Sequence, residues 1–291
     1  MTREIDDFHL VRELVALSSD GWPPDISLDR QRYDDAGQEF GANIPFLPFN
    51  IAGTSGEVIG TSSGPARIVY LHGGAYALGS PRSHRHLVAR LTDAAGMAAF
   101  VPEYPLAPEH PYPAALQSVA NLVEELCRTG PLLLAGDSAG AALALVTFDQ
   151  LAPALQAQIK GLILFSPWMD LRCAGRPYDE VSDHDKSLSP HRLRFFAKLY
   201  LNGERSDHPE VSPLLRTRRA LPPTLVQVAS QELLRLECEE FATESRASGL
   251  PVEIEVWNDA VHVWHWYWPI LESGRAALAR AGEFAAGLEL E

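Results

Sequence analysis

The feature that most constrains the fold is an alternation of short, nearly continuous apolar runs with segments of helical periodicity. The runs do not alternate between apolar and polar residues, as half-exposed strands do. Continuous apolar runs are typical of parallel strands that are buried on both faces. Between them, apolar residues recur at helical spacing, as in 87–95 and 116–126, and a glycine follows each of these two segments. The alternation predicts a doubly wound parallel sheet with helices on both faces. The expected strands are 67–71, 98–104, 131–135, 159–166, 224–230 and 252–257.

Two segments interrupt this alternation. Residues 1–50 read as helical at first and then become rich in Pro, Gly and Asp, and residues 173–215 are polar with one amphipathic patch at 193–201. Ligands of α/β proteins bind where parallel strands end, and long detours without a role are uncommon. We therefore expect an N-terminal cap segment at 1–50 and a main domain at 51–291 that contains a cap insertion at 173–215.

Charge and composition narrow the class of partner. The chain has 24 Lys and Arg against 38 Asp and Glu, a net charge of −14, which argues against nucleic acid or an anionic membrane as the partner. No apolar stretch approaches the ~18 residues of a membrane helix, and the acidic start has no apolar core of a secretory signal. Three widely spaced cysteines suggest a reducing compartment. We expect a soluble cytoplasmic protein.

A Gly-x-Ser-x-Gly pentapeptide lies at 136–140, with Ser138 at its centre. The pattern alone is weak, but an expected strand runs into it and an apolar helix starting at Ala139 leaves it. This context is that of a nucleophile elbow, a tight turn that exposes a strained serine. The alternative is a plain glycine-rich turn with a helix-capping serine, and the context favours the nucleophile.

The segment His72-Gly73-Gly74-Ala75 follows the first of the six expected strands. Acyl transfer builds negative charge on a carbonyl oxygen, and preorganised backbone N–H groups usually hold it. Adjacent glycines let the backbone approach a substrate closely. We expect the oxyanion donors to be Gly73, Gly74 and Ala139, with His72 as a structural hydrogen-bonding residue rather than a base. A plain Gly-Gly turn would not explain why the segment precedes the elbow unit.

Four motifs together resemble the bacterial hormone-sensitive lipase family of α/β-hydrolase serine esterases. They are His72-Gly-Gly-Ala-Tyr, Glu103-Tyr-Pro-Leu-Ala-Pro-Glu-His-Pro-Tyr-Pro-Ala114, Gly136-Asp-Ser-Ala-Gly140 and Ser166-Pro-Trp-Met-Asp-Leu171. The resemblance covers about 67–262. It implies an α/β-hydrolase fold, with a mostly parallel central sheet flanked by helices and a helical cap built from the N-terminus and the insertion after Ser166-Pro-Trp. The domain at 51–291 would then be the catalytic domain.

The chain departs from the family pattern at four places. Ala75 replaces a third glycine, Glu103 a common Asp, Pro105 a frequent Arg and Leu236 a frequent Asp. None of these changes removes a catalytic group. The motif residues His72, Asp137 and Glu103 are expected to support the site.

The remaining catalytic groups should follow later strands, in the order nucleophile, acid, base. Glu232 follows the strand 224–230 where the family has Asp or Glu, and His262 follows the strand 252–257. We therefore expect a Ser138, Glu232 and His262 triad. Asp259 is a rival acid that shares a loop with His262, and three further rivals are expected to be helical and solvated: Glu237, Glu239 and Glu240.

Other histidines and aromatic residues receive structural interpretations. His262 and His265 form a His-x-x-His pair, but no third ligand cluster and no His-Glu-x-x-His motif follow, so we expect no metal and no cofactor. His84 and His86 are expected at the surface or at a helix end. The aromatic cluster at 264–268 is expected to pack in the core and to line part of a pocket.

The resulting expectation is a carboxylesterase that hydrolyses small neutral esters of short to medium acyl chains through an acyl-enzyme. An acyltransferase, lactonase or amidase would use the same triad. A non-catalytic receptor is less favoured, because the plant gibberellin receptors that resemble this family lack the histidine that His262 supplies. A lipase acting on lipid surfaces is disfavoured by the net charge. Homodimerisation along the edge strand 252–257 is a further expectation.

Overall fold

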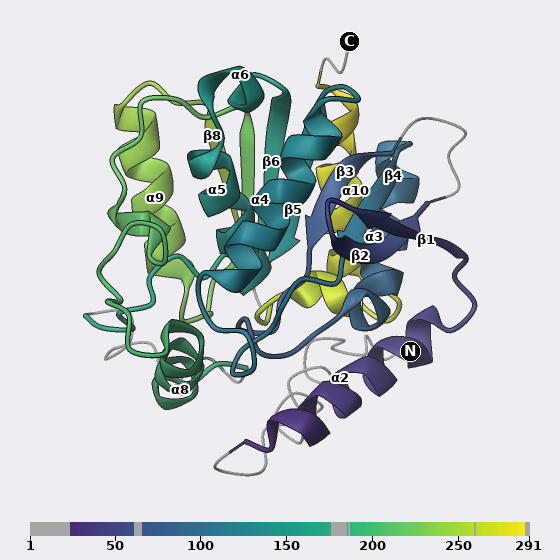
Figure 1. Cartoon of the computed structure of the whole chain (residues 1–291), viewed down its shortest axis with the longest axis horizontal. Coiled ribbons are helices and arrows are strands. Elements are labelled where there is room, and N and C mark those ends of the chain that lie inside the picture. Colours follow the sequence, from purple (N-terminus) through teal and green to yellow (C-terminus); the bar gives the residue numbers. More distant parts are fainter. Residues whose placement is uncertain (1–23, 61–65, 176–184, 186, 259, 289–291) are drawn as a thin grey trace, which may run out of the picture.

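A computed structural model describes residues 24–60, 66–175, 185, 187–258 and 260–288 (Figure 1). Its centre is one eight-stranded sheet in the order β1-β2-β4-β3-β5-β6-β7-β8. Strand β2 is antiparallel to both neighbours, and all other pairings are parallel. All six expected strands are present and the fold class is confirmed. The strands are β1 (Phe46–Ile51), β2 (Thr54–Ile59), β3 (Ala66–Leu71), β4 (Ala98–Pro102), β5 (Leu132–Asp137), β6 (Ile159–Phe165), β7 (Thr224–Ala229) and β8 (Val252–Trp257).

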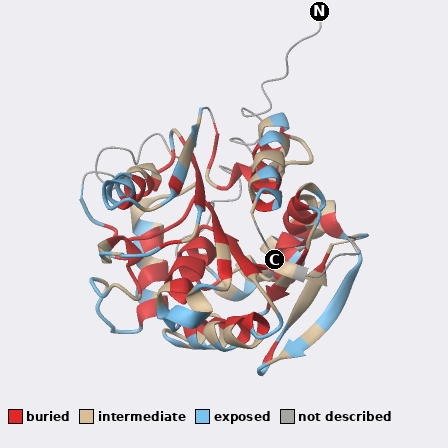
Figure 2. Cartoon of the chain, turned by 90° about the horizontal axis from the view of Figure 1, so that it is seen from above, coloured by how far each residue is buried: buried red, intermediate tan, exposed pale blue. Residues whose placement is uncertain are grey.

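Helices cover both faces of the sheet, which explains the continuous apolar runs. In β5, Leu132 and Leu134 belong to one core, while Leu133 and Ala135 belong to another on the opposite face. Buried residues accordingly concentrate in the strands and on the inner sides of the helices (Figure 2). The first face is covered by α4 (Ala114–Cys127), α5 (Ala139–Gln150) and α9 (Arg235–Ala247), and the second by α3 (Pro81–Ala95) and α10 (Glu272–Ala286).

The hairpin of β1 and β2 was not expected from the sequence. Ile51 pairs with Thr54 across a two-residue turn, Ala52-Gly53, and both turn residues have positive φ, 51° and 81°. Such turns match the twist of antiparallel strands. Most of β1 is exposed or half-buried, and Pro48 interrupts it. The run is mostly apolar, but a proline inside it argues against a regular strand and is tolerated at a sheet edge.

The two segments expected to form a cap contribute helices at one end of the molecule. In Figure 1, α2 (Ile26–Gly41) and α8 (Pro190–Leu201) lie at the lower end, where the parallel strands finish. Helix α8 coincides with the expected amphipathic patch, and α2 packs on α3. The first strand of the sheet in chain order, β1, begins at Phe46, inside the segment 1–50 that was expected to belong to the cap. A cap role for these segments stays a prediction. Three short helices complete the described elements: α6 (Pro153–Gln156), η1 (Pro213–Leu215) and η2 (Trp264–Tyr267).

Within the described ranges, no helix is both long enough and apolar enough to cross a membrane. Strand β8 forms one edge of the sheet, as expected. Dimerisation along this edge stays a prediction.

Close packing of α10 on α3 predicts a stability effect at Gly282. A Cβ at this position would lie 2.4 Å from the Ala94 Cβ and 2.5 Å from the Ala94 carbonyl carbon. Gly282→Ala should therefore lower the free energy of unfolding by about 1–3 kcal/mol, the usual cost of overpacking. Urea denaturation measures it. The matched control is Gly287→Ala, at an exposed helix end with φ −78°, where little change is expected. Equal effects at both positions would contradict the packing argument.

Candidate active site

The turn between β5 and α5 holds Ser138 in a strained conformation. Its φ of 52° and ψ of −122° are unusual for a residue with a side chain. The strain persists because the turn is crowded: a Cβ at Gly140 would lie 2.1 Å from the Leu71 carbonyl oxygen, and one at Gly136 would lie 2.5 Å from the same atom. The two glycines of the pentapeptide are thus required by contact with the end of β3. The turn has the geometry expected of a nucleophile elbow.

His262, on the loop after β8, reaches the serine. Its Nε2 lies 3.0 Å from the Ser138 Oγ, within hydrogen-bond distance. The next residue, Val263, has a positive φ of 49° and its N–H donates to the Ser166 Oγ at 3.3 Å. The histidine loop is therefore fixed to the end of β6 directly beside the ring.

Glu232, after β7, faces the other side of the imidazole. Its Oε1 lies 3.5 Å from the His262 Nδ1, and its side chain is fully buried. The Oε2 accepts hydrogen bonds from the Ser166 hydroxyl at 2.8 Å and from the Ala229 N–H at 3.2 Å. The structure thus brings Ser138, His262 and Glu232 together in one line.

Ser166 is a site residue that the sequence reasoning missed. It donates to Glu232 and accepts from the Val263 N–H, so one hydroxyl ties the acid to the histidine loop. The available signal was its place directly after the expected strand 159–166, at the same sheet edge as the other site residues.

The rival carboxylates take other roles. Glu237 is buried, not solvated as expected, because its Oε1 accepts the Met169 N–H at 2.6 Å. Glu239 is partly exposed and lies 3.4 Å from Arg235, and Glu240 is exposed. Asp259 lies outside the described residues. Among the described rivals, none is bonded to His262.

The expected oxyanion donors need one correction. The Gly73 N–H donates to the Asp137 Oδ1 at 2.9 Å, so it is engaged inside the protein and cannot serve a substrate. The Gly74, Ala75 and Ala139 N–H groups have no acceptor among the described residues. Ala75, with a φ of 53°, therefore takes the place assigned to Gly73.

Two carbonyl contacts set the direction of these N–H groups. The His72 Nδ1–H donates to the Gly73 oxygen at 2.8 Å. The Gly74 oxygen accepts from the N–H groups of Ala77 and Leu78, at 3.0 and 2.7 Å. In a trans peptide the N–H points opposite to the carbonyl. The Gly73 carbonyl shares its peptide with the Gly74 N–H, and the Gly74 carbonyl shares its peptide with the Ala75 N–H. Because both carbonyls bond inside the protein, both N–H groups point away from those bonds.

His72 has the structural role expected of it. The ring stacks on Tyr104 at 4.3 Å, and the Tyr104 hydroxyl donates to the His72 carbonyl oxygen at 2.6 Å. Burial, together with nearby His84, lowers the pKa of His72 to about 3, so the ring is neutral at ordinary pH. Glu103, by contrast, is exposed and is not brought into the site. Its neighbour Tyr104 supplies the support.

The other histidines are interior residues. His84 and His86 are fully buried, so the expected surface position is wrong, whereas the alternative helix-end position agrees with their place near the start of α3. His86 lies with its Nε2 2.7 Å from the Trp266 carbonyl oxygen. His265 is also buried, with its Nε2 2.9 Å from the Gln227 Oε1, and burial lowers the pKa of His265 to about 3. In the described part of the chain, no group of three or more His, Cys, Asp or Glu side chains is arranged to hold a metal ion.

The charge on Glu232 changes the proton affinity of His262. Burial alone would lower the pKa of His262, but the hydrogen bond and the charge of Glu232 outweigh it, with Asp185 and Asp137 adding to the effect, and the net pKa is raised. A raised pKa means that the ring becomes a neutral base only at a higher pH than an ordinary histidine. In its neutral form the ring can accept the Ser138 proton, and as an imidazolium it is stabilised by Glu232.

Comparisons with known proteins agree with this arrangement. A family profile described as alpha/beta hydrolase fold matches residues 68–266. An acetyl-hydrolase of Streptomyces hygroscopicus is 38% identical over 287 residues, covering 96% of this chain and 95% of the relative. An esterase of Acinetobacter venetianus is 33% identical, covering 85% and 84%.

Solved structures are similar over nearly the whole chain. The crystal structure of an esterase from the bacterial hormone-sensitive lipase family superposes with a TM-score of 0.88 at 29% identity, covering 98% of this chain and 99% of that one. The esterase EstE5, in a crystal soaked with p-nitrophenyl butyrate, gives the same TM-score at 28% identity, covering 97% and 98%.

The geometry predicts which carboxylate governs the proton affinity of His262. Glu232→Gln removes the charge and weakens the hydrogen bond that raise the pKa, so the pKa of His262 should fall. NMR titration of histidine-labelled protein measures this shift. Glu237→Gln is the matched control, because that carboxylate is also buried but bonds Met169, and it should leave the His262 pKa in place. An unchanged pKa in Glu232→Gln, or an equal fall in both variants, would contradict the assignment.

Proposed function

The chain belongs to the α/β-hydrolase fold family, in its bacterial hormone-sensitive lipase group of carboxylic ester hydrolases, and we propose that it cleaves esters through a Ser138, His262 and Glu232 triad. The observation that supports this most directly is the 3.0 Å approach of the His262 Nε2 to a serine hydroxyl on a strained elbow. The triad geometry, together with three N–H groups that have no acceptor among the described residues, fits acyl transfer.

In the proposed first half-reaction, the Ser138 Oγ attacks the ester carbonyl carbon while His262 takes its proton. The carbonyl electron pair moves onto oxygen, and the N–H groups of Gly74, Ala75 and Ala139 hold the resulting oxyanion. Glu232 stabilises the imidazolium and keeps its orientation. The bond to the alcohol oxygen then breaks, the electrons return to form the carbonyl, and His262 gives its proton to the leaving alcohol.

In the second half-reaction water replaces the alcohol. His262 removes a proton from water, the oxygen attacks the acyl carbon, and the bond to the Ser138 Oγ breaks as the proton returns to the serine. The same N–H groups hold the second oxyanion. No cofactor is required by these steps.

Aromatic packing near the serine supports a small acyl group. The backbone N–H of Trp168 donates to the Ser138 carbonyl oxygen at 3.1 Å, and the indole side chain is fully buried. Tyr76, next to the oxyanion donors, stacks on Tyr200 of α8 with ring centroids 3.9 Å apart. Tyr76 also lies near Trp168, with ring centroids 6.2 Å apart, so the three rings form one packed cluster. Among the relatives, one is an acetyl-hydrolase and another, from Pseudomonas putida, an ethyl acetate hydrolase. We propose neutral esters of short to medium acyl chains as substrates, with short chains preferred.

Ser138→Ala tests the nucleophile. Loss of the attacking oxygen should lower kcat for p-nitrophenyl acetate by roughly 10⁴-fold or more while the unfolding transition is retained. A fluorophosphonate should label the unmodified protein at Ser138 and leave the variant unlabelled, as read by peptide mass spectrometry. Labelling at another residue, or activity retained in the variant, would refute the proposal.

The preferred acyl chain length tests whether the rings of Tyr76, Trp168 and Tyr200 limit the size of the acyl group. If the packed rings bound the acyl site, the value of kcat/KM for p-nitrophenyl acetate or butyrate should exceed that for the octanoate by at least about tenfold. Tyr200→Ala removes one of the stacked rings and should raise the relative rate on the octanoate. A preference for octanoate in the unmodified protein would show that these rings do not bound the acyl site.

A further inference from the structure

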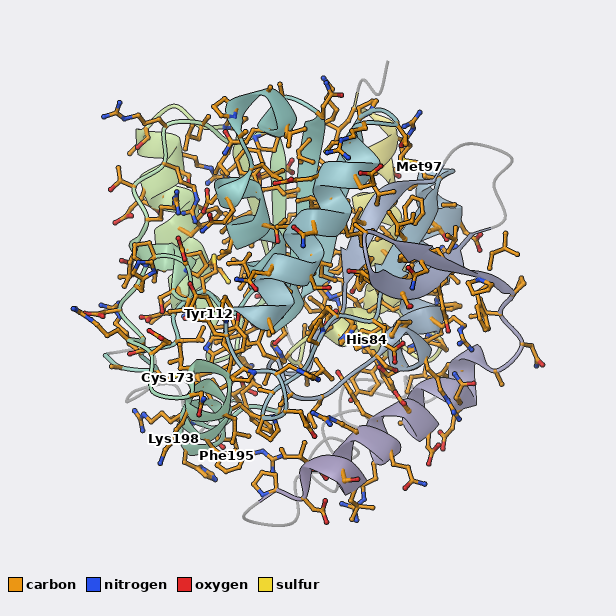
Figure 3. The ribbon with its side chains drawn as sticks, viewed as in Figure 1. His84, Met97, Tyr112, Cys173, Phe195 and Lys198 are labelled. Atoms are coloured by element: carbon orange, nitrogen blue, oxygen red, sulfur yellow. The ribbon has the colours of Figure 1, made fainter. Side chains whose placement is uncertain are left out.

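We propose that His84, on α3, is a positioning residue for the oxyanion loop, acting through the carboxylate of Asp137. This inference rests on the proposed function, because it concerns the alignment of the N–H groups that hold the oxyanion. His84 lies at the side of the molecule that α2 covers (Figure 3). It touches neither Ser138 nor the donor N–H groups, so its effect is indirect.

Asp137 connects the nucleophile turn to the oxyanion loop. It is the residue before Ser138, it is 1% exposed, and its Oδ1 accepts the Gly73 N–H at 2.9 Å and the Tyr70 hydroxyl at 2.8 Å. The carboxylate also packs directly on the loop: a Cβ at Gly73 would lie 2.1 Å from the Oδ2. Rotation of this carboxylate would therefore displace the Gly73 backbone.

The second oxygen of Asp137 has only His84 to face. The His84 Nε2 lies 3.4 Å from the Asp137 Oδ2, a contact without hydrogen-bond geometry, and neither atom has a hydrogen-bond partner among the described residues. A buried carboxylate oxygen without a donor is costly. Because a carboxylate oxygen only accepts, the positioning role requires a proton on the Nε2.

The other ring nitrogen is held by the start of α3. The His84 Nδ1 lies 2.9 Å from the Ser83 Oγ, and Ser83 and Ser80 form the reciprocal cap of this helix. The Ser80 hydroxyl in turn contacts the Asp34 carboxylate on α2. The ring orientation is thus set by the helix cap, and it aims the Nε2 at Asp137.

Surrounding rings close this contact off from solvent. Tyr33 of α2 meets His84 edge-on at 5.5 Å, and His72 lies 5.5 Å away on the loop side. Burial raises the pKa of an aspartate, but here His84 and the Tyr70 hydroxyl outweigh burial and lower the pKa of Asp137. The carboxylate therefore stays ionised, and it needs both donors to keep one orientation.

Loss of the contact between His84 and Asp137 should affect the stabilisation of the transition state more than the binding of substrate. The Gly73 peptide is held at its nitrogen by Asp137 and at its oxygen by His72, and this places the next two N–H groups. Oxyanion donors act on charge that exists only after attack on the carbonyl. Loss of the His84 contact should therefore lower kcat and leave KM nearly unchanged.

Two substitutions at position 84 form a matched pair. His84→Gln can place an amide N–H where the Nε2 stands, whereas His84→Asn can reach only the position of the Nδ1. We expect His84→Asn to lose about 10- to 100-fold in kcat on p-nitrophenyl acetate, with KM changed less than about threefold. His84→Gln should retain most of the activity. A trifluoromethyl ketone, which forms an oxyanion on Ser138, should bind His84→Asn more weakly by the same factor.

The outcomes separate this inference from the proposed function. An unmodified protein that neither hydrolyses the ester nor reacts with a fluorophosphonate would refute the function. An active protein whose folded Asn and Gln variants have equal kcat would refute the positioning role alone. If His84→Asn does not fold, Tyr70→Phe removes the other side-chain donor to Asp137 and keeps the ring. It should show the same fall in kcat at constant KM, and an unchanged kcat would overturn the inference.

Discussion

The close approach of the β3 end to the turn at Ser138 is the constraint on which the site depends. Gly140 and Gly136 leave no room for a Cβ against the Leu71 carbonyl. This contact keeps the nucleophile and the oxyanion loop within one rigid unit, and Asp137 adds a buried hydrogen bond between them. Backbone positions of positive φ without glycine gather around the same unit, as strain at a functional site often does. They include Ala75, Tyr76, Ser138, Ser166 and Val263.

The sequence predicts the order of the elements and the residues that follow strand ends, because both depend on local pattern. Ser138, Glu232 and His262 each stand just past a recognisable apolar run, and parallel strands bring such positions to one edge. The direction of an N–H is different. Whether Gly73 or Ala75 faces a substrate depends on which carbonyls and side chains hold the neighbouring peptides, and those contacts come from Asp137 and from His72.

The burial of polar side chains on helices is the other property that the local sequence pattern did not predict. His84 and Glu237 are polar residues on amphipathic helices, where solvent exposure is the ordinary expectation. In the fold, Tyr33 of α2 packs against the first, and the Met169 N–H satisfies the second. Both burials depend on residues from distant segments: a ring covers His84, and a backbone N–H replaces water at Glu237. No periodicity in α3 or α9 reveals those partners.

Helix α2, which precedes the sheet in the chain, is bonded to the same structural unit as the catalytic groups, and this gives the helix a physical role. Arg30 donates to the carbonyl oxygens of Ala77 and Ala107 and forms a bidentate pair with Glu109. Asp34 contacts the cap of α3 through Ser80. A long helix joined to the end of the oxyanion loop and to the helix that carries His84 restricts both. Because the donors must be in place before charge develops on the substrate, such restriction acts on the rate of the chemical step more than on the affinity for the ester.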